Sequence, residues 1–158
     1  MRRSIGQKGF SMIEVMVVTL VIGITMAASV PSFSRFMQSS NLDSASMQVA
    51  SHFRLARATA VAQGVPHLIL WSNYNYYYLM TDTDRNGIYS AGEDFTGPYW
   101  LPDGILVTNP QGFQGSYISF LPNGTSSQAV SWELVNERGA KLSMTVLGPT
   151  GQIIIDKG

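Results

Sequence analysis

Residues 9–30 of the chain read GFSMIEVMVVTLVIGITMAASV, and they decide the class of protein. From Val15 to Ser34 no residue is charged. At a rise of about 1.5 Å per residue, a helix over this run nearly matches the hydrocarbon thickness of a bilayer, about 30 Å. The segment therefore predicts a membrane-spanning helix.

The charges at the two ends of this apolar run predict its orientation. Only Arg35 follows it closely, whereas three basic residues precede it, namely Arg2, Arg3 and Lys8. Because positive charge collects on the cytoplasmic side, we expect the N-terminus in the cytoplasm and everything after the membrane-spanning helix outside.

An ordinary secretory signal peptide is the alternative, with Ala27-Ala28-Ser29 as its cleavage site. Its apolar region would be only about 7 to 15 residues long. Glu14 also argues against it, because an unpaired carboxylate costs about 2.5 to 3.5 kcal/mol near a bilayer centre. We therefore favour a retained anchor in which Glu14 has a partner.

The segment Gly9 to Glu14, followed by an apolar run, resembles the class III signal of type IV pilins and pseudopilins. The resemblance implies that a prepilin peptidase cleaves between Gly9 and Phe10, and that the new amine of Phe10 is methylated. It also implies that Pro31 is the helix-kinking proline of the mature chain. In the membrane, the Glu14 carboxylate can pair with the free amine of Phe10 on a neighbouring subunit and set the axial register.

Apolar or small residues continue at spacings of three and four from Phe33 to Ala62, which predicts one helix that leaves the membrane and ends at Gly64 and Pro66. The polar stretch 41–46 is expected to loosen it. The apolar stripe of its second half needs a sheet to cover it.

Short runs bounded by turn residues predict that sheet. The expected strands are 67–71, 76–81, 105–108, 117–120, 129–135, 141–147 and 153–155, and the expected turns are 72–73, 122–124, 136–139 and 148–151. The fold class is α+β, with a long N-terminal helix packed on a mostly antiparallel head as in pilins. The expected division is a leader over 1–9, a helix over 10–64 that spans the membrane at about 12–34, and an extracytoplasmic head over 65–158.

Within the pilin superfamily, four further segments resemble the GspH/FimT branch, namely 52–70, 82–93, 118–124 and 148–153. One departure concerns DNA. DNA-binding members of this branch carry arginines after the C-terminal glycine, whereas here Gly151 is followed by Gln152-Ile153-Ile154-Ile155. The 10 basic and 10 acidic residues include three basic ones in the leader, so the remainder is mildly acidic. Both observations argue against DNA as a partner.

Catalytic chemistry has little support in the sequence. There is no cysteine, which excludes disulfides and thiolate sites. Neither His52 nor His67 has a histidine or carboxylate at metal-ligand spacing, and no Ser/His/Asp set can be assembled. We therefore expect no enzyme.

Residues 82–93 match the spacing of a calcium loop, with Asp82, Asp84, Asn86 and Glu93 as oxygen ligands and Gly87 at the turn. A calcium EF-hand needs flanking helices, yet the preceding residues 76–81 are typical of a strand. We favour a metal-free turn with Asp and Asn caps and keep calcium as the alternative cofactor.

Two other groups have alternative interpretations. The tyrosines at 74 and 76–78 suggest a stacking platform, but strand alternation predicts that Tyr76 and Tyr78 face one way and Tyr77 the other, as in ordinary packing. Arg54 and Arg57 share one side of a helix and could bind an anion, although a solvated face or an intersubunit pair is commoner.

The sequence thus predicts a structural minor pilin or pseudopilin. After processing by prepilin peptidase it would assemble with other pilins, near the tip of a type II secretion pseudopilus or type IV pilus. It would lie in the inner membrane before assembly. The alternative is a DNA-binding or adhesive tip subunit of a competence or type IV pilus.

Overall fold

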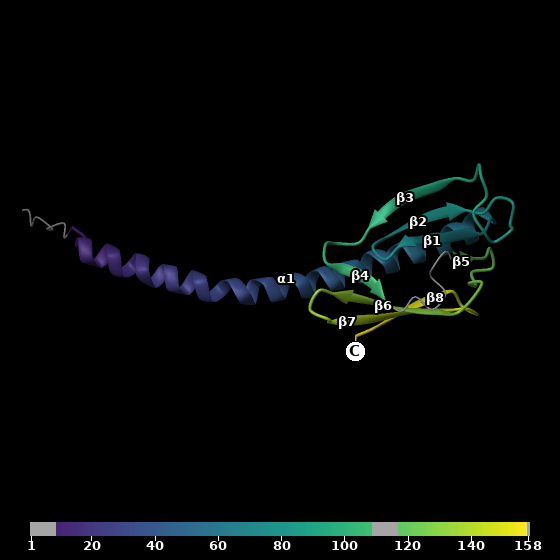
Figure 1. Ribbon diagram of the computed structural model, residues 1–158. Coiled ribbons are helices and arrows are strands. Elements are labelled where there is room, and N and C mark those ends of the chain that lie inside the picture. The colour runs from purple at the N-terminus through teal and green to yellow at the C-terminus, as the bar shows by residue number, and fades with distance from the viewer. Residues whose placement is uncertain (1–8, 109–116, 158) are drawn as a thin grey trace, which may run out of the picture. The chain divides into compact units, whose positions relative to one another are not determined.

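The computed structural model describes residues 9–108 and 117–157, except for the side chains of Pro31 and Ser32 (Figure 1). The predicted leader, apart from Gly9, lies outside these residues. One helix, α1 (Met12–Gln63), is followed by β1 (His67–Asn73), β2 (Tyr76–Thr81), β3 (Phe95–Trp100), β4 (Ile105–Thr108), β5 (Tyr117–Phe120), β6 (Val130–Asn136), β7 (Lys141–Leu147) and β8 (Gln152–Asp156).

The chain divides into two units, residues 1–37 and 38–158. In the first unit, the helical residues from Met12 to Val30 are all exposed, although nearly all are apolar. By length and composition, α1 is capable of crossing a membrane. The apolar all-round surface indicates that its partners lie outside the chain.

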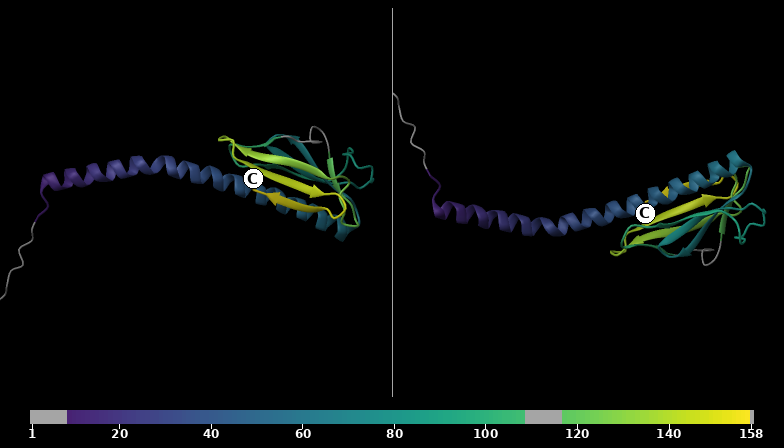
Figure 2. Two further views of the ribbon diagram at one scale, coloured as in Figure 1. Left: turned by 90° about the horizontal axis from the view of Figure 1, so that it is seen from below. Right: turned by 90° about the horizontal axis from the view of Figure 1, so that it is seen from above.

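The second unit contains two four-stranded sheets, ordered β3-β2-β1-β5 and β4-β6-β7-β8. Every pairing between these strands is antiparallel. Figures 1 and 2 show the two sheets beside the C-terminal part of α1, which runs along both of them.

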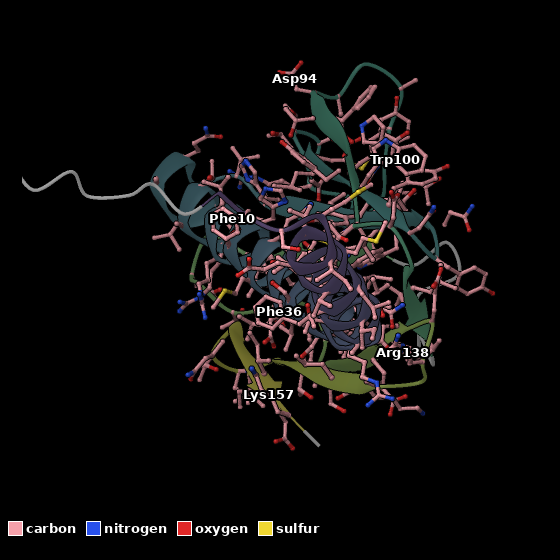
Figure 3. The ribbon with its side chains drawn as sticks, turned by 90° about the vertical axis from the view of Figure 1, so that its left-hand side faces the viewer. Phe10, Phe36, Asp94, Trp100, Arg138 and Lys157 are labelled. Carbon is pink, nitrogen blue, oxygen red and sulfur yellow. The ribbon has the colours of Figure 1, made fainter. Side chains whose placement is uncertain are left out.

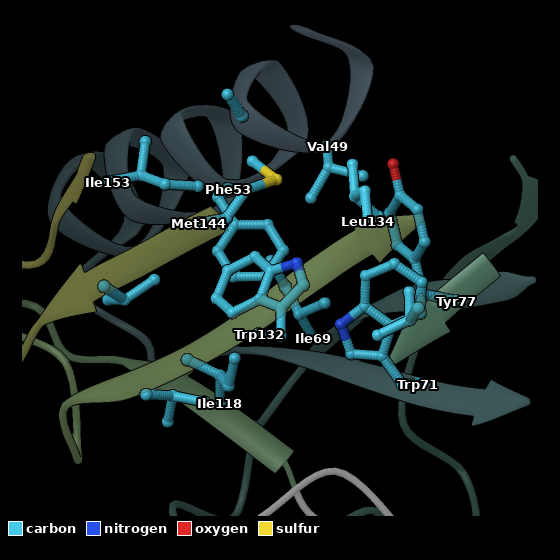
Figure 4. Close-up of a cluster of buried hydrophobic side chains, with 14 of the residues drawn as sticks. Val49, Phe53, Ile69, Trp71, Tyr77, Ile118, Trp132, Leu134, Met144 and Ile153 are labelled. Carbon is cyan, nitrogen blue, oxygen red and sulfur yellow. The ribbon is translucent and has the colours of Figure 1, made fainter. Parts of the chain in front are cut away.

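The core of the second unit lies between this part of α1 and the inner faces of both sheets (Figure 4). Phe53 on the helix is 1% exposed, and its ring centroid lies 5.1 Å from that of Trp132 and 5.9 Å from that of Phe120. Small residues beside it, Ala45, Ala56 and Ala60, are fully or almost fully buried. They belong to the buried side of the helix, while alternate residues of β6 and β7 fill the other side of the core.

The predicted α+β class and antiparallel pairing are confirmed, but several details were wrong. The strands form two sheets rather than one. The helix is continuous through residues 41–46, because Leu42, Ala45 and Ser46 are buried in the head and this packing outweighs their neighbours' weak helix preference.

The strand β3 was not predicted at all, because it contains Gly97 and Pro98, which usually disfavour strands. It forms the edge of its sheet, where a proline is tolerated. The turn expected at 72–73 lies instead at residues 74–75, since β1 continues through Asn73.

Candidate functional sites

The N-terminal candidate site begins at Gly9 and Phe10, which precede the helix. Phe10 is 82% exposed, and a Cβ on Gly9 would meet nothing within 4 Å. The Ser11 carbonyl oxygen accepts hydrogen bonds from the amides of Glu14 (3.0 Å) and Val15 (3.2 Å) and so starts the helix. Cleavage between Gly9 and Phe10 stays a prediction.

Glu14 is an exposed carboxylate in the first helical turn. Ser11 and Glu14 have the spacing of a capping box, in which a glutamate supports the helix start, and the helix dipole favours a negative charge there. Glu14 thus has a role available within its own chain besides the predicted pairing with a neighbour. A glutamine would keep the size and the side-chain oxygen of Glu14 but not its charge, so it shows which effects depend on the charge.

Three hydroxyl groups within the apolar run donate hydrogen bonds to carbonyl groups of the helix itself. Thr19 Oγ1 donates to the Val15 carbonyl at 3.0 Å, and Thr25 Oγ1 donates to the Val21 carbonyl at 3.0 Å. Ser29 Oγ donates to the Thr25 carbonyl at 2.8 Å. These donors need no water, which is the condition for burial in hydrocarbon.

The acidic loop, residues 82–94, joins β2 to β3, so strands rather than helices flank it. One carboxylate oxygen from each of Asp82, Asp84 and Glu93 lies within 4.8 Å of the others. Ligands that surround Ca²⁺ at about 2.3 to 2.6 Å have separations up to this size. Three of the four predicted ligands are therefore close enough to share an ion.

Asn86, the fourth predicted ligand, is oriented differently. Its side-chain oxygen accepts from the Ile88 amide at 2.8 Å, and its Nδ2 donates to Asp84 Oδ2 at 2.8 Å and to Ser90 Oγ at 2.6 Å. Sequence reasoning had also overlooked Ser90, whose hydroxyl donates to Asp84 Oδ2 at 2.8 Å. Asn86 would have to turn before its oxygen joined the carboxylates.

Backbone amides already hold the carboxylates of the loop. Asp82 accepts from the amides of Asn86 (3.0 Å) and Gly87 (2.9 Å), and Glu93 accepts from those of Thr83 (2.8 Å) and Ser90 (2.9 Å). Burial raises the pKa of Asp82, whereas the hydrogen bond from Ser90 lowers that of Asp84. The contacts suit a metal-free turn, and the calcium site stays a prediction.

The arginine groove is a hollow of about 660 Å³ lined by Arg54, Arg57, Ala58, Val61, Gly151, Gln152 and Ile153. Arg57 Nε donates to the Gly124 carbonyl oxygen at 2.8 Å and so ties α1 to the loop after β5. Arg54 is exposed and has no hydrogen bond or ion pair with any described residue. The helical spacing placed the two arginines together, but it gave no sign of the opposing wall from β8.

The histidines bond to neighbours that the sequence does not reveal. His52 Nδ1 and the Tyr77 hydroxyl are 2.6 Å apart, and the His52 ring lies 4.2 Å from that of Tyr99. His67 Nδ1 is 3.0 Å from the Val65 carbonyl oxygen. Burial lowers the pKa of His52 and raises that of Tyr77. Neither histidine has a carboxylate partner among the described residues.

The tyrosine run follows the predicted alternation, since Tyr77 is fully buried while Tyr76 and Tyr78 are partly exposed on the other face. Two exposed aromatic residues of β3, Phe95 and Trp100, join that outer face. They were missed together with their strand, although the sequence FTGPYW contains three aromatic residues that could have indicated them.

Two kinds of comparison with known proteins found matches, and these agree with each other. The model of the family described as type II transport protein GspH matches residues 45–151, and that of the prokaryotic N-terminal methylation motif matches residues 5–30. No curated protein matches the sequence. Among solved structures, the type IV minor pilin FimU of Pseudomonas aeruginosa has a similar fold, with a TM-score of 0.57 and 15% identity over 77% of this chain and 92% of that one.

Proposed function

Because the chain belongs to the GspH family of type II transport proteins, we propose that it is a structural, pilin-like subunit cleaved between Gly9 and Phe10 and assembled into a filament. The family consists of pilins and pseudopilins rather than enzymes. The observation that carries the proposal is an N-terminal methylation motif joined to an apolar helix whose side chains are exposed on every side. Such a surface requires lipid before assembly and other helices after it.

Cleavage supplies the group that assembly needs. Hydrolysis of the Gly9–Phe10 bond by prepilin peptidase removes the basic leader and frees an amine on Phe10, which then receives a methyl group and keeps its positive charge. The Glu14 carboxylate of one subunit pairs with this amine on the next. Either charge left unpaired in hydrocarbon is costly, so the pairing of the two groups selects one axial register. Pro31 adjusts the path of the helix where it leaves the membrane.

Before assembly, the subunit lies in the inner membrane with its N-terminus in the cytoplasm and its head outside. Its partners are prepilin peptidase first and then other pilins. We place it near the tip of a type II secretion pseudopilus or a type IV pilus, as a subunit of low abundance.

Replacement of Glu14 tests this function. We expect Glu14→Ala and Glu14→Gln to insert into the membrane and to be cleaved normally, but to be lost from sheared filaments. The glutamine variant is the sharper one, because it retains the size and the side-chain oxygen of Glu14 and removes only the charge. Normal incorporation of Glu14→Gln would refute the charge-pairing role and leave the capping role.

A second candidate function is DNA binding by the same subunit, and the arginine groove favours it, because two exposed arginines, Arg54 and Arg57, line it. Gln152 and the three isoleucines after it offer no further positive charge. Binding of the full-length protein in detergent to duplex DNA, weakened by salt and by Arg54→Ala, would support this role. The absence of salt-dependent binding would exclude it.

A further inference from the structure

A row of five aromatic rings, here called the aromatic surface, covers the outer side of β2 and β3. Consecutive ring centroids are 4.6 Å apart from Trp100 to Tyr76, 5.9 Å from Tyr76 to Tyr78, 5.8 Å from Tyr78 to Phe95 and 6.3 Å from Phe95 to Tyr89. Trp100 is 56% exposed and Phe95 is 53% exposed. The hydrophobic core lies on the opposite face of this sheet, so the row is not needed to form it. Contiguous exposed apolar surface of this kind indicates a binding surface.

The geometry of the rings bears on what covers them. Three of the four ring pairs are edge-to-face, with interplanar angles of 83° to 90°. A platform for sugars or nucleobases needs faces turned the same way, whereas this row alternates faces and edges. Pro98, without an amide hydrogen, lies in the edge strand and opposes the addition of another strand. Side chains of a protein surface are the occupants that fit an uneven apolar row.

The charge beside the aromatic surface is negative. Asp84 and Asp94 are exposed in the acidic loop, and Glu93 is partly exposed. The one basic residue of the loop, Arg85, donates to the Gly64 carbonyl oxygen at 3.0 Å. An aromatic row beside carboxylates repels phosphate and favours arginine, which stacks on ring faces and forms paired hydrogen bonds with carboxylates.

The arginine groove of the same head has the complementary composition. Arg54 and Arg57 line it together with the apolar side chains of Ala58, Val61 and Ile153. It lies between α1 and the start of β8, whereas the aromatic surface lies over β3. Figures 1 and 3 show β3, with its labelled Trp100, on the side of the head away from β8 and Lys157.

We propose that the aromatic surface of one copy binds the arginine groove of a second copy of this chain. Arg54 of the groove lies against the aromatic rings and the neighbouring carboxylates of the acidic loop, while Val61 and Ile153 cover exposed ring surface. Because the two surfaces differ, the contact is heterologous and joins one copy to the next without using the same surface twice. It involves residues of the second unit only, and requires neither cleavage at Gly9 nor the charge of Glu14.

The test is site-specific crosslinking of the full-length chain in detergent, which is clean because the chain has no cysteine. One preparation carries Ile88→Cys beside the aromatic surface, the other carries Ala58→Cys in the groove, and a short bis-maleimide joins them. The control pairs Ile88→Cys with Ser131→Cys, an exposed position on the outer face of β6. We expect the yield of mixed dimer from the first pair to exceed the yield from the control pair about tenfold. One well-packed contact changes an association constant by about that factor.

Charge reversal then identifies the contact. Arg54→Glu in the groove copy should reduce the mixed dimer about tenfold, because like charges then face each other, and Asp94→Arg in the other copy should restore it. Trp100→Ala should reduce it, whereas Leu106→Ala, at an equally exposed residue of β4, should not. Equal yields from test and control pairs, or no rescue by the double reversal, would overturn the proposal. Because assembly through Glu14 is not involved, the outcome is independent of the function proposed above.

Discussion

The two parts of α1 that belong to different units differ in how their apolar side chains are exposed. From Met12 to Val30 the helix is apolar on all sides and exposed on all sides. From Leu42 to Ala60 it has a single buried stripe that ends in the core of the head. A helix stripe predicts a partner within the same chain, whereas an all-round apolar surface predicts lipid or other chains.

The two parts of α1 obtain their stability from different sources. The part in the head owes its position to contacts with both sheets, so mutations there should change the unfolding of the head. The N-terminal part makes no comparable contacts in the described structure, so its mutations should change insertion and assembly instead.

The largest expected effect comes from Phe53→Ala. Removal of a buried phenylalanine side chain costs about 3 to 5 kcal/mol of unfolding free energy, because it leaves a cavity beside Trp132 and Phe120. The matched control is Phe36→Ala, since Phe36 is 68% exposed. Denaturant unfolding of the full-length protein in detergent, followed by tryptophan fluorescence, measures both. Equal losses of unfolding free energy from the two variants would contradict the view that only the second part of α1 stabilises the head.

Calcium should give the next largest effect if the acidic loop binds it. Binding to the folded state alone adds about 2.7 kcal/mol at roughly a hundredfold excess over the dissociation constant. The melting temperature of the head should then rise with calcium and fall with chelator, and Asp84→Asn should abolish the difference. Superimposable melting curves, with no calorimetric binding at millimolar calcium, would leave the metal-free turn.

Gly151→Ala should destabilise the head by about 1 to 3 kcal/mol, because overpacking adds to the backbone cost of a positive φ. A Cβ there would lie 2.5 Å from the Gly124 carbonyl oxygen, which also accepts the hydrogen bond from Arg57, and φ is +59°. Gly139 also has a positive φ, +78°, but open space around it. Chemical unfolding measures both variants, and the difference between the losses from Gly151→Ala and Gly139→Ala gives the steric cost of the added Cβ at Gly151. Equal losses would argue against a close contact between that Cβ and the Gly124 carbonyl oxygen.

The smallest expected effect is a pH dependence from His52 on the same helix. Burial lowers its pKa below the unfolded value of 6.5, so the folded state binds fewer protons than the unfolded state. Stability should therefore fall as pH decreases below about 6.5, and the partial exposure of the ring keeps the change small. His52→Gln should flatten this part of the stability profile. If the stability profile of His52→Gln equals that of the unchanged protein, other groups cause this pH dependence.

The sequence predicted those parts of the fold that depend on periodicity. The alternation that buries Tyr77 and leaves Tyr76 partly exposed follows from strand geometry alone. In contrast, the edge strand β3 was hidden by Gly97 and Pro98, and residues 41–46 were misread because tertiary burial of Leu42 decided their conformation.

The candidate sites also have features that local spacing predicts and features that only the tertiary structure shows. Local spacing placed Asp82, Asp84 and Glu93 close together. It could not reveal that the Asn86 oxygen is used by Ile88, nor that Arg57 bonds to Gly124, because the first depends on a rotamer and the second on a contact between distant parts of the chain. The pairing of the aromatic surface with the arginine groove likewise needed the three-dimensional arrangement.

The most direct test of the pilin-like function is the intact mass of the protein extracted from membranes of cells that contain prepilin peptidase. We predict a chain that begins at Phe10 and carries one methyl group on its amine, with residues 1–9 absent. A chain that begins near Ser29 would identify an ordinary secretory signal peptide. It would also remove Glu14 and most of the apolar helix, and would contradict the proposed function.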